Sequence, residues 1–163
     1  MNAAVDALCG DLAAELLDRG WKMAAAESCT GGLIAAACTD LAGSSAWFER
    51  GFVTYSNEAK SELLHVDPAA IASHGAVSEV VARAMAFGAL RHSHAQCSVA
   101  VTGVAGPSGG TPAKPVGTVC FAWATKGRPA RAETKHFAGD REAVRRQSVD
   151  FSLAKVLEVL DEA

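Results

Sequence analysis

The chain has 163 residues, of which 50% are hydrophobic and 20% are charged, and its formal net charge is −3. This length and composition are typical of a globular protein, so we expect residues 1–163 to form a single domain. The chain has no basic stripe and no apolar stretch near the roughly 20 residues of a membrane helix, so neither nucleic acid nor a membrane is an expected partner. The N-terminal region carries Asp6 and Asp11 and lacks the basic start of a secretory signal, which indicates a cytoplasmic protein.

Hydrophobic periodicity and capping residues predict helices and strands in alternation. In chain order, helices are expected over 3–19, 31–40, about 57–64, from 68, over 79–91 and from 141 onward. Strands are expected over 21–26, 52–55, 97–101, 117–124 and 130–137, whereas residues 45–49 fit no single element. Residues 126–129 have the composition of a hairpin turn between the last two strands. This order predicts a three-layer α/β/α sandwich with a mixed, largely parallel sheet, antiparallel at the hairpin.

The stretch around which the chain is organised is AESCTGG, residues 26–32, between the first strand and the second helix. A hydroxyl at such a turn is placed for chemistry or for holding an anion at the helix start. The alternative is that Ser28 or Thr30 only caps the helix. A glycine-rich loop, TGVAGPSGG, begins at Thr102 and also follows a strand. Because α/β sheets bind ligands beyond the carboxyl ends of their strands, we expect both loops to lie on one rim.

Lys60, at the end of YSNEAK (residues 55–60), is the candidate base for Ser28. No histidine lies near Ser28, and the G-x-S-x-G pattern of α/β-hydrolases is absent. Serine–lysine pairs are a known variant of the nucleophile–base arrangement. A lysine of ordinary pKa, about 10.4, is charged at pH 7, so this role requires burial to lower the pKa, and Glu58 would oppose that shift. The alternative is a solvated lysine on a helix surface.

The remaining candidate groups each have two interpretations. The glycine-rich loop either aims N–H groups at a phosphate or an oxyanion or is a plain connection, and it lacks the P-loop pattern. Of Arg141, Arg145 and Arg146, we expect Arg145 to face inward, since it lies four residues before Val149. Cys29 is a rival nucleophile, ranked below Ser28 because no basic partner is specified for it.

Cysteine and histidine spacing does not indicate a metal site. The five cysteines include no C-x-x-C pair, and their odd number argues against a disulfide framework. His92 and His94 lie two residues apart and would point to different sides of a helix. We expect no metal and no other cofactor, and cysteines that are mostly small core residues.

Together these motifs resemble the CinA C-terminal domain family, from about Leu8 to Leu157. They are AESCTGG at 26–32, GSS at 43–45, GFVTYSNEAK at 51–60, GAVS at 75–78, TGVAGP at 102–107, KPVGTV at 114–119 and GDR at 139–141, followed by Arg145. Stand-alone members of the family are nicotinamide-nucleotide amidases. The resemblance therefore implies hydrolysis of the carboxamide of nicotinamide mononucleotide to nicotinate mononucleotide and ammonia, a step of pyridine nucleotide recycling.

The resemblance also assigns roles to particular residues. It implies Ser28 as nucleophile and Lys60 as general base, supported by Tyr55 and Thr30, in a homo-oligomer without a metal. It implies that the substrate is held by Gly31, Thr102, Gly103 and Gly106, with Arg145 meeting the phosphate. The alternative is a non-catalytic nucleotide-binding or regulatory module on the same fold, whereas a protein acting on DNA is disfavoured by the charge.

Overall fold

The computed structural model describes residues 2–163, and its centre is a mixed five-stranded sheet in the order β2-β1-β3-β4-β5. The strands are β1 (Met23–Glu27), β2 (Phe48–Val53), β3 (Cys97–Gly103), β4 (Thr118–Thr125) and β5 (Arg131–His136). Strand β1 pairs in parallel with β2 and β3, whereas β4 pairs antiparallel with β3 and β5. The mixed sheet with an antiparallel hairpin is thus confirmed, with two parallel and two antiparallel pairings.

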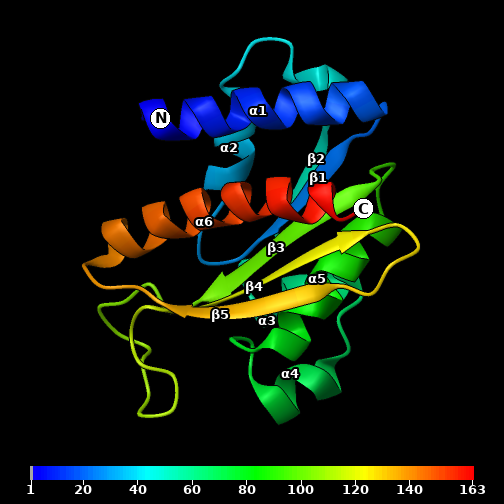
Figure 1. Ribbon diagram of the computed structural model, residues 1–163. Helices are drawn as coiled ribbons and strands as arrows, with labels where there is room; N and C mark the ends of the chain where they lie inside the picture. The colour runs from blue at the N-terminus through cyan, green and yellow to red at the C-terminus, as the bar shows by residue number, and fades with distance from the viewer. Residues whose placement is uncertain (1) are drawn as a thin grey trace.

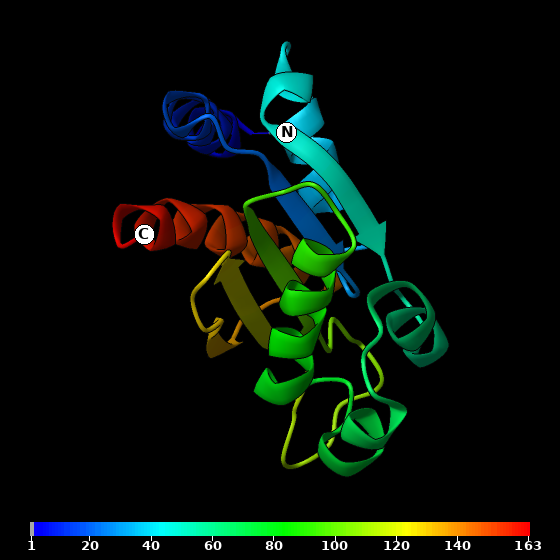
Figure 2. The same ribbon diagram turned by 90° about the vertical axis from the view of Figure 1, so that its right-hand side faces the viewer.

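Helices cover both faces of the sheet, which confirms the three-layer architecture (Figures 1 and 2). One face carries α1 (Ala3–Arg19), α2 (Leu33–Thr39) and α6 (Arg141–Asp161); the other carries α3 (Asn57–Leu64), α4 (Pro68–His74) and α5 (Glu79–Arg91). A 3-10 turn, Ser44–Ala46, precedes β2. Because side chains alternate along a strand, Ala25 of β1 packs under α1 and α6, whereas its neighbours Ala24 and Ala26 pack under α5.

The expected element boundaries differ from the structure mainly at the edge of the sheet. Strand β2 ends at Val53, so Tyr55 lies in the connection after the strand and not within it, as the prediction over 52–55 had it. As an edge strand, β2 pairs only with β1 and exposes Arg50 and Val53, which blurs the alternation of apolar and polar residues. Helix α2 begins two residues later than expected, because Gly31 and Gly32 adopt positive φ angles of 58° and 104°.

Helix α5 approaches α3 closely at Gly88, and this contact predicts a change in stability. A Cβ on Gly88 would lie 2.2 Å from the Leu64 carbonyl oxygen, which is backbone and cannot swing away. We expect Gly88→Ala to lower the free energy of unfolding by about 2 kcal/mol, in the range of overpacked cores. The matched control is Gly10→Ala in the exposed face of α1, where nothing lies within 4 Å.

In the control, alanine removes backbone freedom without a clash, so Gly10→Ala should raise the free energy of unfolding by about 0.5–1 kcal/mol. Urea denaturation of both variants measures the two effects. Equal shifts in both variants would contradict the close approach of α5 to α3.

Residues 2–163 were searched for membrane-spanning helices, metal-ligand clusters and disulfides. Within residues 2–163, no helix is long and apolar enough to cross a membrane, and the cytoplasmic location stays a prediction. The same residues contain no group of three or more His, Cys, Asp or Glu side chains that could hold a metal ion. All five cysteines are buried and free, as the core interpretation predicts.

Candidate active site

Ser28 directly follows β1 at the carboxyl edge of the sheet. Its backbone N–H donates to the Val101 carbonyl at 3.0 Å, which anchors the residue to the neighbouring strand β3. Its side-chain Oγ lies 3.0 Å from Nζ of Lys60 and 3.4 Å from the Tyr55 carbonyl oxygen. Ser28 is 7% exposed, so its hydroxyl is nearly enclosed but borders a cavity.

Lys60 is a buried residue on the inner face of α3, not a solvated helix lysine, since it is only 1% exposed. Ser56 caps this helix by accepting from the Ala59 N–H, which starts α3 immediately after the connection from β2. Besides Ser28, the Lys60 amine contacts the carbonyl oxygens of Thr54 at 3.1 Å and Tyr55 at 3.2 Å, and that of Ser56 at 3.5 Å. The parallel pairing of β1 with β2 thus brings two residues 32 positions apart into contact.

Burial lowers the pKa of the Lys60 amine below its ordinary value, and the nearby carboxylate of Glu58 opposes this shift only in part. A charged ammonium group has three N–H donors, enough for the Ser28 hydroxyl oxygen and the two nearer carbonyls, those of Thr54 and Tyr55. The Ser28 hydroxyl then donates to the Tyr55 carbonyl. A neutral amine keeps two donors for the carbonyls and presents its lone pair to the Ser28 hydroxyl. Loss of one proton therefore turns Lys60 from a donor into an acceptor for Ser28.

Cys29 is a poor rival to Ser28. Burial raises the pKa of its thiol to about 12, so the thiol stays protonated at neutral pH. Since the thiolate is the reactive form of cysteine, Cys29 is not set up as a nucleophile.

A cavity of about 350 Å³ opens over the Ser28–Lys60 contact. Its walls come from the Ser28 turn, the connection after β2, the segment before α5, the glycine-rich loop and the first turn of α6. Thr102, Gly103 and Gly106 line it, and the Thr102 hydroxyl donates at 3.0 Å to the carbonyl of Ala76, another lining residue. None of the residues 2–163 that line the cavity is acidic, which favours an anionic ligand.

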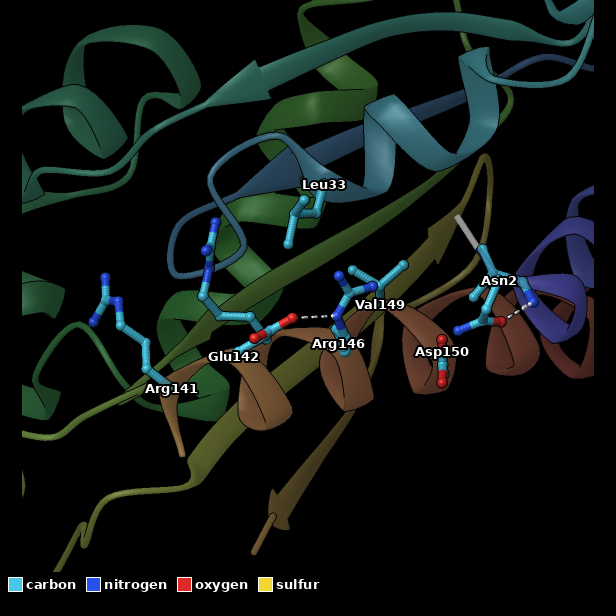
Figure 3. A pocket seen from close by; sticks show the side chains of 9 residues that line it. Asn2, Leu33, Arg141, Glu142, Arg146, Val149 and Asp150 are labelled. Carbon is cyan, nitrogen blue, oxygen red and sulfur yellow. Dashed lines mark hydrogen bonds and ion pairs between the residues drawn. The ribbon is translucent and has the colours of Figure 1, made fainter. Parts of the chain in front are cut away.

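The arginines of α6 separate into three environments. Arg145 donates to the carbonyl oxygens of Cys29 at 3.1 Å and Thr30 at 3.3 Å, and it lines a neighbouring cavity of about 430 Å³. Arg146 forms an exposed ion pair with Glu142 in that neighbouring cavity, at 3.1 Å (Figure 3). Arg141 lines both cavities, and in the one above Ser28 it contacts the Gly106 carbonyl and the Tyr55 hydroxyl.

Comparison with known proteins identifies the family. The family described as CinA C-terminal domain matches residues 5–160 of the chain. This chain belongs to the CinA C-terminal domain family. Nicotinamide-nucleotide amidohydrolase PncC from Enterobacter agglomerans is 54% identical over 147 residues, which cover 90% of each chain. The CinA-like protein from Mycolicibacterium gilvum is 54% identical over 147 residues, which cover 90% of this chain but 35% of that longer protein.

Solved structures agree with this family membership. The competence/damage inducible protein CihA from Agrobacterium tumefaciens superposes with a TM-score of 0.95 at 40% identity, covering 99% of this chain and 98% of that one. The CinA superfamily protein KP700603 from Klebsiella pneumoniae gives a TM-score of 0.94 at 40% identity and covers 100% of both chains.

Glu27 holds the turn that carries Ser28 in this CinA-family chain, a role that the sequence analysis did not assign. Its carboxylate is fully buried; Oε1 accepts from the Thr30 hydroxyl at 2.6 Å and the Ile34 N–H at 2.8 Å, and Oε2 accepts from the Ala35 N–H at 3.0 Å. The free N–H groups at the start of α2 are therefore bound by Glu27. The interpretation of Ser28 or Thr30 as the helix cap is wrong. The N-cap position of α2 is held by Gly32, which has no side chain to accept a bond from the helix start.

Replacing Glu27 by glutamine should destabilise the fold. The amide nitrogen that replaces one carboxylate oxygen would face an N–H donor, either Ile34 or Ala35, and leave it without an acceptor. We expect Glu27→Gln to lower the free energy of unfolding by about 2 kcal/mol, the usual scale for an unsatisfied buried donor. Glu62→Gln on the exposed face of α3 is the control. If chemical denaturation gave the same stability for both variants, the buried carboxylate would not hold the turn.

The structure brings together six of the nine predicted site residues and keeps three apart. Six line one cavity: Ser28, Tyr55, Lys60, Thr102, Gly103 and Gly106. Three lie outside that cavity, behind the Ser28 turn: Thr30, Gly31 and Arg145. Arg141, which the sequence analysis did not select, is the arginine of α6 that reaches the cavity.

Proposed function

We propose that this chain hydrolyses the carboxamide of nicotinamide mononucleotide to nicotinate mononucleotide and ammonia, a step of pyridine nucleotide recycling. The observation that carries the proposal is the 3.0 Å contact between the Lys60 amine and the Ser28 hydroxyl, on a lysine that is 1% exposed. A buried amine next to a serine is the arrangement that lets lysine act as a base near neutral pH. The relatives called nicotinamide-nucleotide amidohydrolase, 54% identical over most of the chain, support the choice of substrate.

The first half of the reaction uses the neutral form of Lys60. Its lone pair takes the Ser28 proton while Oγ attacks the carboxamide carbon, giving a tetrahedral intermediate. The glycine-rich loop lines the cavity from Thr102 to Gly106, and in this mechanism its free backbone N–H groups stabilise the oxyanion, each typically worth about 3 kcal/mol. The Val104 N–H is not one of them, because it donates to the Thr118 carbonyl at 2.8 Å. Lys60, now an ammonium group, returns its proton to the leaving nitrogen, so that ammonia departs and an ester to Ser28 remains.

The second half repeats the proton transfers with water. Lys60 takes a proton from a water molecule, whose oxygen attacks the ester carbon, and then returns the proton to Ser28 Oγ as nicotinate mononucleotide leaves. The carbonyls of Thr54 and Tyr55 hold the amine in place throughout, since they accept from it in both charge states. The backbone of Tyr55 thus positions the base, while its hydroxyl lies near Arg141.

Incubation of the protein with nicotinamide mononucleotide tests the proposal. We expect stoichiometric release of ammonia and nicotinate mononucleotide, followed by a coupled ammonia assay and by chromatography. Binding of the nucleotide without ammonia release would instead support a non-catalytic nucleotide-binding module.

The family resemblance also leads us to propose that the protein is cytoplasmic and forms a homo-oligomer. Light scattering on the purified protein measures its molar mass and so tests whether it forms an oligomer.

A further inference from the structure

The cavity above Ser28 has two cationic side chains, and they differ in what they can offer a ligand. The Lys60 amine is buried and occupied by Ser28 and by backbone carbonyls. Arg141, at the start of α6, also lines this cavity. With no acidic side chain among the lining residues, an anionic group that enters this cavity meets Arg141.

The partners of Arg141 leave its positive charge uncompensated. Nη1 donates to the Gly106 carbonyl at 2.8 Å and Nη2 donates to the Tyr55 hydroxyl at 3.2 Å, and both acceptors are neutral. A guanidinium group has five N–H donors, so three are left for a ligand. The adjacent carboxylate, Glu142, pairs with Arg146, and Figure 3 shows Arg141 pointing away from that pair. The two contacts therefore orient the guanidinium without neutralising it.

Arg145 does not line the cavity above Ser28. Its Nε and Nη2 donate to the carbonyls of Cys29 and Thr30, on the side of the Ser28 turn away from the cavity. These bonds tie α6 to the turn that carries the nucleophile. Like Arg141, Arg145 keeps three N–H donors, but it lines the neighbouring cavity and not the one above Ser28, so Arg141 is the arginine placed to meet a phosphate there.

We propose that Arg141 binds the substrate's phosphate monoester and makes the site selective for a nucleotide over the corresponding nucleoside, and that Arg145 positions the Ser28 turn. This inference rests on the proposed function, since it assumes that a nicotinamide nucleotide occupies the cavity with its carboxamide at Ser28. Arginine suits the task because its planar fork of donors matches two phosphate oxygens at once.

The test compares two substrates that differ only in the phosphate: nicotinamide mononucleotide and nicotinamide riboside. For Arg141→Ala we expect kcat/KM on the mononucleotide to fall by about 10- to 100-fold, mainly through KM, the range for hydrogen bonds to a charged group. On the riboside the same variant should match the parent, because there is no phosphate to lose. Arg146→Ala, a neighbouring arginine of α6 that lies outside the cavity, should change neither substrate.

Three results would overturn the inference. They are an unchanged kcat/KM of Arg141→Ala on the mononucleotide, an equal loss on both substrates, and a phosphate-specific loss in Arg145→Ala in place of Arg141→Ala. Calorimetric binding of the mononucleotide and the riboside to the parent and to Arg141→Ala provides a second measurement that needs no turnover. If the parent releases no ammonia, the proposed function fails, and a phosphate-dependent affinity lost only in Arg141→Ala would still support the role of Arg141.

Discussion

Replacing Ser28 by alanine is expected to abolish ammonia release from nicotinamide mononucleotide. The hydroxyl is the group that attacks the carboxamide in the proposed mechanism, and its Oγ contacts the Lys60 amine at 3.0 Å. Loss of a nucleophile that works with a base typically costs many orders of magnitude in kcat, so we expect a fall of at least about 10³-fold. Binding of the nucleotide should persist, because alanine keeps the cavity open and leaves Arg141 untouched.

Cys29→Ala is the matched control for the nucleophile, since it removes the neighbouring side chain of the same turn. The raised pKa of Cys29 keeps the thiol protonated, so this variant should retain most of the parental rate. Initial rates of ammonia release and calorimetric binding of the nucleotide measure both variants. A parental rate in Ser28→Ala, or a collapse in Cys29→Ala alone, would exclude Ser28 as the nucleophile.

Lys60 should be equally intolerant of change, even to another cation. Arginine keeps the positive charge and donors but stays protonated at every accessible pH, so Lys60→Arg cannot accept the Ser28 proton. Lys60→Met removes the amine with little change in shape, and both variants should lose about 10³-fold or more in kcat, near the upper range for a general base. Lys126→Met in the exposed hairpin turn is the control and should keep the parental rate.

Thermal unfolding of these variants separates a chemical effect from a failure to fold. Folded and inactive Lys60→Met and Lys60→Arg proteins would support the base. Either of them with a rate near that of Lys126→Met would argue that Lys60 only fills space beneath Ser28.

The lowered pKa of Lys60 also predicts the sign of two pH effects. Activity should rise as the pH passes the lowered pKa, because only the neutral amine accepts a proton. Between that pKa and the ordinary value of about 10.5, the unfolded chain binds more protons at this position than the folded chain does. The contribution of Lys60 to the free energy of unfolding therefore increases with pH across this window and is lost as the pH falls through the folded pKa. Lys60→Met should remove both dependences.

Local sequence signals predicted the elements well where a single residue decides a boundary. Ser56, Ser78 and Asp140 each cap the helix expected after them, through bonds from Ala59, Val81 and Ala143 respectively. The same signals misplaced β2, because an edge strand with one partner alternates less clearly than a central strand does.

The candidate site depended on relations that no local pattern contains. The sequence offered Ser28 and Lys60 as residue types, but their contact arises because β1 and β2 lie side by side and α3 starts directly after β2. Glu27 was missed because serine and threonine are the usual helix caps, whereas here a carboxylate at the end of a strand binds the helix start. Arg145 was selected over Arg141 from its spacing to Val149, which indicates a buried face but not which cavity that face borders.

Direct titration of the Lys60 amine tests the central claim, that this group loses its proton beside Ser28 at a lower pH than an ordinary lysine does. In solution NMR of protein labelled with ¹⁵N-lysine, the Lys60 signal is assigned as the one missing from Lys60→Arg. We expect the pKa of that amine to lie below about 10.5, the ordinary value for lysine. A Lys60 amine that stays protonated up to or beyond that pH would contradict the serine–lysine mechanism.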